Sequence, residues 1–178
     1  MLKTIFFSLI LLFTNIKAYG QEIHQEILQN ILSPNLIGQY ELKVIGLNVY
    51  NIKLWSQNKK FSYNQKFAIE INYKMNFSRE NLAKRSIEEI KRIQNITDQN
   101  ELIVYHREFM KIFLDVKKGD CKVAIFSPLN GVELFYNHKS VGKITEPKLA
   151  RYFVDIWLSK NSSYPKMTKT ILGESNDY

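Results

Sequence analysis

The chain has 178 residues, a formal net charge of +8 and one cysteine, Cys121. This length suits a single domain with a sizeable core, and one thiol excludes an internal disulfide. The basic residues are dispersed, without the dense tract typical of nucleic-acid binding, so we expect no nucleic-acid partner. Attraction to anionic lipid or to an anionic ligand is the alternative to a simple solvated surface.

The first twenty residues have the layout of a secretory signal peptide. Lys3 gives a positive start, residues 5–13 are apolar apart from one serine, and Ala18-Tyr19-Gly20 supplies small residues at a cleavage point. The apolar run is shorter than the ~20 residues that span a bilayer. We therefore predict a signal peptide over 1–20, cleaved near Gly20, and one periplasmic or secreted domain over 21–178 without a membrane span. A buried N-terminal strand or helix is the alternative.

The first part of the mature chain predicts one helix followed by strands. Apolar residues at helical spacing favour a short leading helix over 22–32, packed on the edge of the domain. Strands are expected at 36–45 and 47–55, with Gly46 as a turn or bulge between them. Residues 67–75 alternate strictly between apolar and polar side chains, which predicts one buried and one wet face. Such alternation is typical of antiparallel sheets.

Two helices are expected next. Ser78 is a suitable N-cap for a helix over 81–93. A second helix carries an apolar stripe of the width needed to cover a sheet, from Leu102 to Val116. Gly119 is expected at the C′ position of this helix.

The last third of the chain predicts three short strands and two helices. The strands are expected at 121–127, 132–136 and 140–144, and a helix over 146–159 follows them. A final helical turn is expected over 166–172. The sum is an α+β domain in which an antiparallel sheet of about six strands is covered on one face by helices.

Several turn and helix signposts occur in a familiar order. They are Gly38, Val49-Tyr50 with Leu54, the helix start Phe-Ser-Arg-Glu-Asn-Leu at 77–82, Lys118-Gly119-Asp120, Asn130-Gly131, Asn137 with Gly142, Ile156-Trp157-Leu158 and Leu172-Gly173. In this order, over residues 36–173, the chain resembles the chalcone isomerase-like family, specifically its exported bacterial branch. The resemblance implies an open-faced sandwich, in which a long curled antiparallel sheet wraps around a layer of helices. The wider superfamily includes plant enzymes that close chalcones to flavanones and relatives that bind fatty acids without catalysis.

The chain departs from this family at positions that carry its chemistry. Family members commonly have an arginine shortly after the glycine of the first strand, and the alignment places Leu42 there. No threonine or serine is present over 39–55, where the plant enzymes use a hydroxyl. An aliphatic side chain cannot replace a guanidinium that stabilises an oxyanion. We therefore transfer no catalytic residue from the family to this chain.

No other grouping in the sequence predicts a reaction. His24, His106 and His138 have no second ligand at metal-binding spacing along the chain. A nucleophile motif and a phosphate-binding glycine loop are also missing from the sequence. We expect a structural or surface role for each histidine, no metal and no cofactor. Cys121 is expected to behave as a small buried hydrophobe.

The candidate ligand-binding residues are Tyr50, Tyr73, Arg85 and Tyr105. The patterns above place each tyrosine on an inward face, where a phenol seeks a polar partner. One interpretation is ordinary core packing. The other is a pocket between sheet and helices, in which the hydroxyls and a cation, Arg85, hold an acidic head group. Arg85 lies near the border of an apolar stripe, where a solvated side chain is the alternative.

Three functions remain open at this point. The first is a periplasmic, non-catalytic carrier of a small apolar ligand such as a fatty acid or an aromatic acid, because buried methylenes contribute ~0.8 kcal/mol each. The second is an isomerase or lyase that acts on an enone or phenolic compound, with tyrosine as acid or base. The third is a structural or interaction domain without a pocket. We favour the first, since it requires no catalytic residue.

Overall fold

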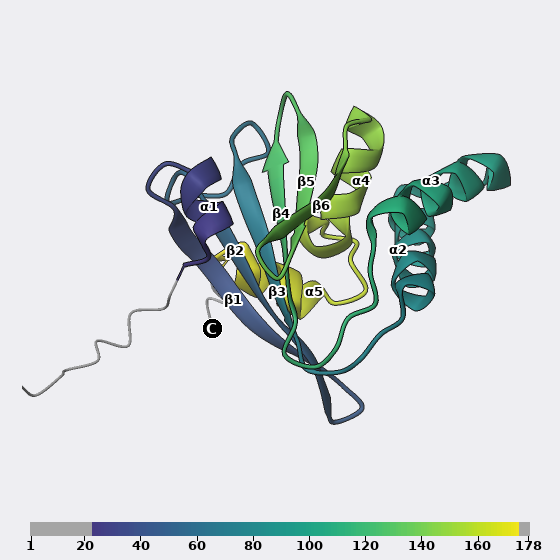
Figure 1. Ribbon diagram of the computed structural model, residues 1–178, viewed down its shortest axis with the longest axis horizontal. Coiled ribbons are helices and arrows are strands. Elements are labelled where there is room, and N and C mark those ends of the chain that lie inside the picture. Colours follow the sequence, from purple (N-terminus) through teal and green to yellow (C-terminus); the bar gives the residue numbers. More distant parts are fainter. Residues whose placement is uncertain (1–22, 175–178) are drawn as a thin grey trace, which may run out of the picture.

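Six strands form one antiparallel sheet in which the order of the strands follows the chain (Figure 1). A computed structural model describes residues 23–174, so the predicted signal peptide lies outside the described residues. The strands are β1 (Asn35–Val44), β2 (Leu47–Ser56), β3 (Phe67–Tyr73), β4 (Cys121–Ser127), β5 (Gly131–Tyr136) and β6 (Lys139–Ile144).

Four helices cover one face of the sheet, and a short fifth helix lies on the other face. The covering helices are α2 (Arg79–Gln94), α3 (Gln99–Ile112), α4 (Pro147–Leu158) and α5 (Pro165–Ile171), and the short one is α1 (Gln25–Asn30). All four covering helices contribute side chains to the main core, together with inward residues such as Ile52 and Leu54 of β2. This arrangement confirms the predicted α+β open-faced sandwich. Within residues 23–174, no helix has the length and apolar character needed to cross a membrane.

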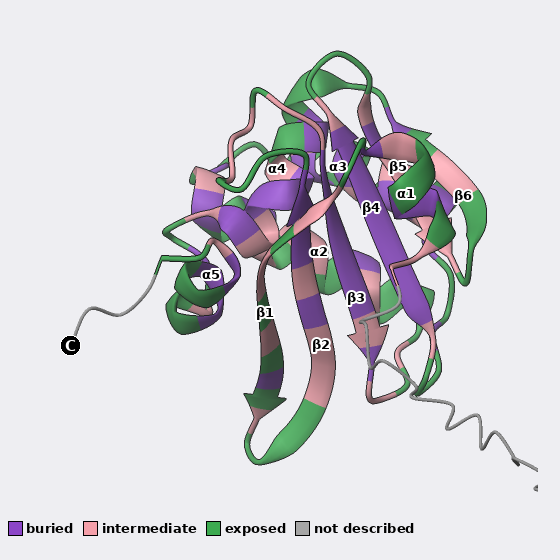
Figure 2. Cartoon of the chain, turned by 90° about the vertical axis from the view of Figure 1, so that its left-hand side faces the viewer, coloured by how far each residue is buried: buried purple, intermediate pink, exposed green. Residues whose placement is uncertain are grey.

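The prediction of a wet face on the third strand is wrong. Ala68 and Glu70 of β3 occupy the expected wet positions, yet they are buried. The reason is α1, which packs on the outer face of the sheet rather than on its edge (Figure 2). Ile27 of α1 and Ile31, which directly follows α1, form a second, smaller core with outward residues of the central strands. The central strands are therefore covered on both faces.

The helix α2 begins as predicted, but α3 ends earlier than predicted. The Ser78 hydroxyl accepts a hydrogen bond from a first-turn amide of α2 at 3.2 Å, which confirms the N-cap. The expected helix over Leu102 to Val116 instead stops at Ile112, and the chain then extends. Phe77 and Val116 exchange two backbone hydrogen bonds of 2.9 Å. These bonds use the backbone groups of Val116 that a longer α3 would need for its own helical hydrogen bonds. Gly119 therefore lies in the turn before β4 and does not cap α3.

Helix α5 lies directly against the backbone of β1 at Gly38. A Cβ atom at this position would lie 2.2 Å from the carbonyl oxygen of Thr170 and 2.8 Å from the Cα of Ile171. Contacts this short are sterically forbidden, and both partners are backbone atoms that cannot rotate away. The absence of a side chain at Gly38 thus allows α5 to close this end of the domain.

We predict that Gly38→Ala lowers the free energy of unfolding by about 1–3 kcal/mol, because the added methyl overpacks the contact with α5. Urea denaturation of the two proteins measures this difference. An unchanged unfolding midpoint would show that α5 does not pack this closely on β1.

Candidate ligand-binding cavity

The main cavity has a volume of about 550 Å³ and lies between the inner face of β1–β3, helix α2 and the ends of α4 and α5. This volume falls in the ~300–1,000 Å³ range of small-molecule sites. Most of its wall is apolar, and typical wall residues are Val44, Val49, Ile71, Met75, Leu82 and Met167. The cavity can therefore bury an apolar molecule of moderate size.

The floor of the cavity is a row of side chains that crosses three strands. Leu42 of β1 is paired with Tyr50 of β2, which is paired with Tyr73 of β3. All three line the cavity. Leu42 is buried, and it is the residue that stands where the resemblance expects an arginine. The floor of the cavity is therefore apolar at Leu42.

Tyr50 and Tyr73 differ in how their hydroxyls are satisfied. The Tyr50 hydroxyl accepts a hydrogen bond from the Trp157 indole N–H at 3.2 Å and lies 3.7 Å from the Met167 sulfur. The Tyr73 hydroxyl forms no hydrogen bond with any described residue, although the residue is only 6% exposed. Burial raises the pKa of both phenols, so both keep their protons near neutral pH.

A smaller hollow of about 60 Å³ adjoins the main cavity. The two share five wall residues, namely Ile71, Tyr73, Leu82, Ser86 and Trp157. A cavity of ~10–15 Å³ already holds one water, so this hollow has room for a carboxylate. Its remaining wall includes Lys122 of β4.

Lys122 is a buried cation that has no ion-pair partner in the described part of the chain. It is 9% exposed, and its Nζ forms no hydrogen bond or ion pair with any residue in 23–174. Its nearest favourable partners are aromatic rings, with Nζ 4.8 Å from the centroid of Phe113 and 5.9 Å from that of Tyr73. Burial lowers the pKa of Lys122 to about 8, against a smaller opposing effect of Asp115 and Asp120. An amine of this kind favours an anionic ligand that can enter the hollow.

Arg85 lies at the mouth of the cavity and not inside it. Its side chain is 76% exposed and bonds to the Glu88 carboxylate at 3.1 Å. Arg92 and Glu89, which also line the mouth, form a second pair at 2.7 Å. The charges on this side of α2 therefore neutralise one another.

Tyr105 is separated from the other candidate residues. Its hydroxyl donates to the Glu101 carboxylate, one helical turn away, and Lys148 of α4 binds the same carboxylate at 2.8 Å. Burial and the Glu101 carboxylate raise the pKa of Tyr105. The structure thus brings Tyr50, Tyr73 and Arg85 to one cavity and leaves Tyr105 in the contact between α3 and α4.

Lys122 is the residue that sequence reasoning missed. In the predicted strand over 121–127, alternate positions share a face, so Lys122 shares its face with Ala124 and Phe126. The structure places all three on the side of the helices. The available signal was therefore a lysine on the apolar, inward side of a strand.

A second polar cluster lies on the outer face, beneath α1. The Glu70 carboxylate accepts hydrogen bonds from Lys53, Trp55 and Asn72 at 2.8–2.9 Å. Burial opposes ionisation of Glu70, but these three donors together lower its pKa. Glu70 is thus an ionised, fully bonded group in the outer core.

His24, just before α1, and His138, in the turn between β5 and β6, join this cluster. His24 Nε2 lies 3.4 Å from Glu70 and 3.5 Å from the Cys121 sulfur, and His138 Nδ1 lies 3.2 Å from Glu26. Among the described residues, this gives two sets of three potential metal ligands, in which the ligand atoms lie within 4.8 Å of one another: His24, Glu70 and Cys121, and His24, Glu26 and His138. The spacing of the histidines in the sequence does not indicate these sets. Burial raises the pKa of Cys121 to about 12, so its thiol stays protonated. The contacts fasten α1 to the sheet.

Comparison with known proteins identifies the family. The chain matches the chalcone isomerase-like family over residues 43–173. Among solved structures, a fatty-acid binding protein of Arabidopsis thaliana shares the fold with a TM-score of 0.60 and 13% sequence identity, over 79% of this chain and 87% of that one. A comparison with curated protein sequences gives no match. Because the family match covers most of the chain, the protein belongs to the chalcone isomerase-like family.

Proposed function

We propose that this protein is a non-catalytic binding protein for a small apolar carboxylic acid, such as a fatty acid or an aromatic acid. The single observation that carries the proposal is the Lys122 amine, which is buried beside the main cavity and forms no ion pair with any described residue. In the proposed complex the apolar body fills the main cavity, and the carboxylate lies in the small hollow against Lys122. The Tyr73 hydroxyl, which lacks a partner among the described residues, donates to the same carboxylate.

The physical reason for a carboxylate is charge compensation. A buried ammonium is costly, because the apolar surroundings do not replace its hydration. The rings of Phe113 and Tyr73 compensate only part of this cost. A ligand carboxylate restores the missing partner, and hydrogen bonds to charged groups contribute about 1.5–3 kcal/mol each. The bonds to Lys122 therefore add specificity to the affinity that the apolar wall supplies.

The fold of the Arabidopsis structure supports the proposal by analogy. Its printed description is that of a fatty-acid binding protein, and it shares the arrangement of sheet and helices with this chain. At 13% identity this likeness concerns the fold alone, so the argument for an acid ligand depends on the cavity and Lys122.

One observation favours the alternative function of an isomerase or lyase. The Lys122 pKa of about 8 lies near the range that proton transfer requires. However, an enone isomerase also needs a group that stabilises an oxyanion, and Leu42 occupies the position of the family's arginine. Incubation of the protein with a chalcone distinguishes the two functions. Racemic product at the uncatalysed rate counts against the enzyme, and faster, stereoselective closure would establish it.

We also propose that the protein acts outside the cytoplasm. The support is the charged, apolar and small-residue pattern of residues 1–20, which lie outside the described part of the chain. Expression of the full chain in a bacterial host, followed by mass spectrometry of the periplasmic fraction, tests this. A periplasmic product that begins near Gln21 supports export, and an uncut cytoplasmic product contradicts it.

We predict that Lys122→Met weakens the binding of decanoate about tenfold to a hundredfold, because one charge-assisted hydrogen bond is lost. Titration calorimetry measures the change. Binding of 1-decanol, which has the same chain without the charge, is expected to stay within about threefold of the unmodified protein.

Two matched variants locate the effect. Lys139→Met removes an exposed lysine of β6 and should leave decanoate affinity unchanged, and Arg85→Ala at the mouth should have little effect. Equal losses in Lys122→Met and Lys139→Met would reject Lys122 as the head-group partner. A larger loss in Arg85→Ala than in Lys122→Met would return that role to Arg85.

We predict that decanoate affinity falls as the pH rises above about 8. The ligand stays ionised in this range, whereas Lys122 loses its proton. The decanoate affinity therefore falls by up to about tenfold per pH unit. Affinity should be constant between about pH 6 and 7, and 1-decanol should show no pH dependence. Decanoate affinity that stays constant up to about pH 9.5 would contradict the proposed contact.

We predict that Lys122→Met also stabilises the ligand-free protein, by about 3 kcal/mol at neutral pH. The folded-state pKa of Lys122 lies below its unfolded value, so the unfolded chain binds more protons between about pH 8 and 10.4. Stability of the unmodified protein should therefore rise with pH across this window, and that rise should vanish in the variant. Urea denaturation at several pH values measures both effects, and a destabilised variant would contradict them.

A further inference from the structure

The turn between β1 and β2 holds an unusual residue. Ile45 and Gly46 form its two central positions with φ of +50° and +77°, which are the signs of a type I′ turn. Asn-Gly or Asp-Gly is preferred in such turns, and a β-branched residue with positive φ is a strained outlier. Ile45 is also 97% exposed, and the neighbouring Leu47 is 59% exposed. We call residues 44–47 the hairpin tip.

A second hairpin of the same chain has a residue type that is favoured in such a turn. Asn137 and His138, between β5 and β6, also have positive φ at both central positions. Asn tolerates this conformation, and its side chain bonds to the neighbouring Asp120 at 3.0 Å. Folding alone therefore explains Asn137 but does not explain an isoleucine at the equivalent position of the hairpin tip.

The hairpin tip forms one lip of the main cavity. Ile45 and Leu47 belong to the cavity wall, and Met75 and Phe77 of the segment between β3 and α2 complete the apolar lining at this end. An apolar path thus leads from the exposed tip into the cavity. Figure 1 shows the tip at the lower end of the molecule, beyond the layer of helices.

Lysines surround this end of the molecule. Lys74 lies beside β2, because its amide donates to the Val49 carbonyl at 2.9 Å, and the Lys118 amide donates to the Asn76 side chain at 2.8 Å. Lys74, Lys117 and Lys118 form no ion pair with any residue in the described range.

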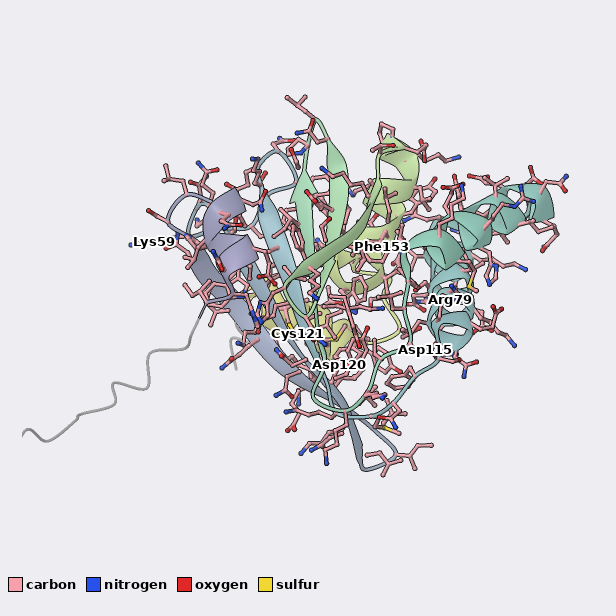
Figure 3. The ribbon with its side chains drawn as sticks, viewed as in Figure 1. Lys59, Arg79, Asp115, Asp120, Cys121 and Phe153 are labelled. Carbon is pink, nitrogen blue, oxygen red and sulfur yellow. The ribbon has the colours of Figure 1, made fainter. Side chains whose placement is uncertain are left out.

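The acidic side chains at this end already accept hydrogen bonds from backbone amides. Asp115 accepts from the Arg79 amide and Asp120 from the Lys117 amide, and Figure 3 shows both acids beside the lower loops. On the hairpin, Lys43 pairs with Glu41 at 3.3 Å, with both side chains well exposed. The apolar tip is therefore flanked by lysines that form no ion pair within residues 23–174. The net charge is +8 for the full chain and +6 without residues 1–20, which contain Lys3 and Lys17 and no acid.

We propose that the hairpin tip docks on the surface of a bilayer that contains anionic lipids. Ile45 and Leu47 enter the acyl region, and Lys74, Lys117 and Lys118 contact the phosphates. Apolar side chains flanked by basic ones are typical of proteins that bind at this interface. The docked orientation places the cavity mouth against the membrane, where an apolar acid can enter without crossing water. This last step depends on the proposed function, whereas the docking itself does not.

The substitution Ile45→Asn tests the docking, because it creates a preferred type I′ turn. The variant should unfold at a temperature about 2–4 °C higher, so a loss of binding cannot be attributed to misfolding. Co-sedimentation with vesicles of phosphatidylethanolamine and phosphatidylglycerol should show about tenfold weaker partitioning of the variant. Leu129→Asn is the matched control, since Leu129 is 94% exposed in the turn between β4 and β5, at the opposite end of the sheet (Figure 1).

The lysines are tested with Lys117→Gln and Lys118→Gln on the same vesicles. Each change should weaken partitioning about fivefold, and vesicles of phosphatidylcholine alone should bind the unmodified protein weakly. Equal partitioning of Ile45→Asn and the unmodified protein, or an equal loss in Leu129→Asn, would overturn the proposal. So would sedimentation velocity that shows a dimer which Ile45→Asn dissociates, because the tip would then bind a second copy.

These measurements distinguish a failure of the docking proposal from a failure of the proposed binding function. If the protein binds these vesicles through Ile45 but binds no decanoate, the docking surface stands and the proposed function falls. If decanoate binds but partitioning is the same in Ile45→Asn and Leu129→Asn, the reverse holds.

Discussion

The proposed ligand site depends on a buried positive charge, the Lys122 ammonium, which forms no ion pair with any residue in 23–174. Lys122 lies on the inner face of a central strand, among aromatic rings and without a carboxylate partner in the described residues. Placing an ammonium there lowers stability, and a hydrophobic residue of similar length would remove that loss. Under the proposed function, a ligand carboxylate supplies the missing partner of this cation. The same contact is then what distinguishes an acid from a neutral molecule of the same length.

The two faces of the sheet differ, because the outer face is closed by α1 and the inner face borders the main cavity. On the outer face, α1 covers Glu70 and Cys121, and three hydrogen-bond donors satisfy the Glu70 carboxylate. That face is closed and internally neutral. On the inner face the helices leave space over β1–β3, where Leu42, Tyr50 and Tyr73 form an apolar floor. The cation of Lys122 on β4 lies three strands from Leu42 on β1, which corresponds to about 14 Å.

Local signals in the sequence were sufficient for most of the fold. Alternation and turn residues predicted the strands, and Ser78 predicted the start of α2. These local signals failed where contacts between residues distant in sequence decide the burial of a side chain or the end of a helix. Glu70 looked solvent-exposed because α1 is remote in sequence, and α3 was predicted too long because Phe77 pairs with Val116. The structure places Tyr50 and Tyr73 in one cavity, whereas Tyr105, which was grouped with them, bonds to Glu101 on its own helix.

The most direct test of this account is the protonation of Lys122 itself. A carbon-13 NMR titration of the side chain, assigned with Lys122→Met, measures its pKa in the ligand-free protein and with decanoate bound. The account predicts a pKa of about 8 without ligand and a rise toward or above the ordinary value of ~10.4 when the carboxylate is present. A pKa near 10.4 without ligand, or one that decanoate leaves unchanged, would contradict the claim that an acid is the missing counter-ion.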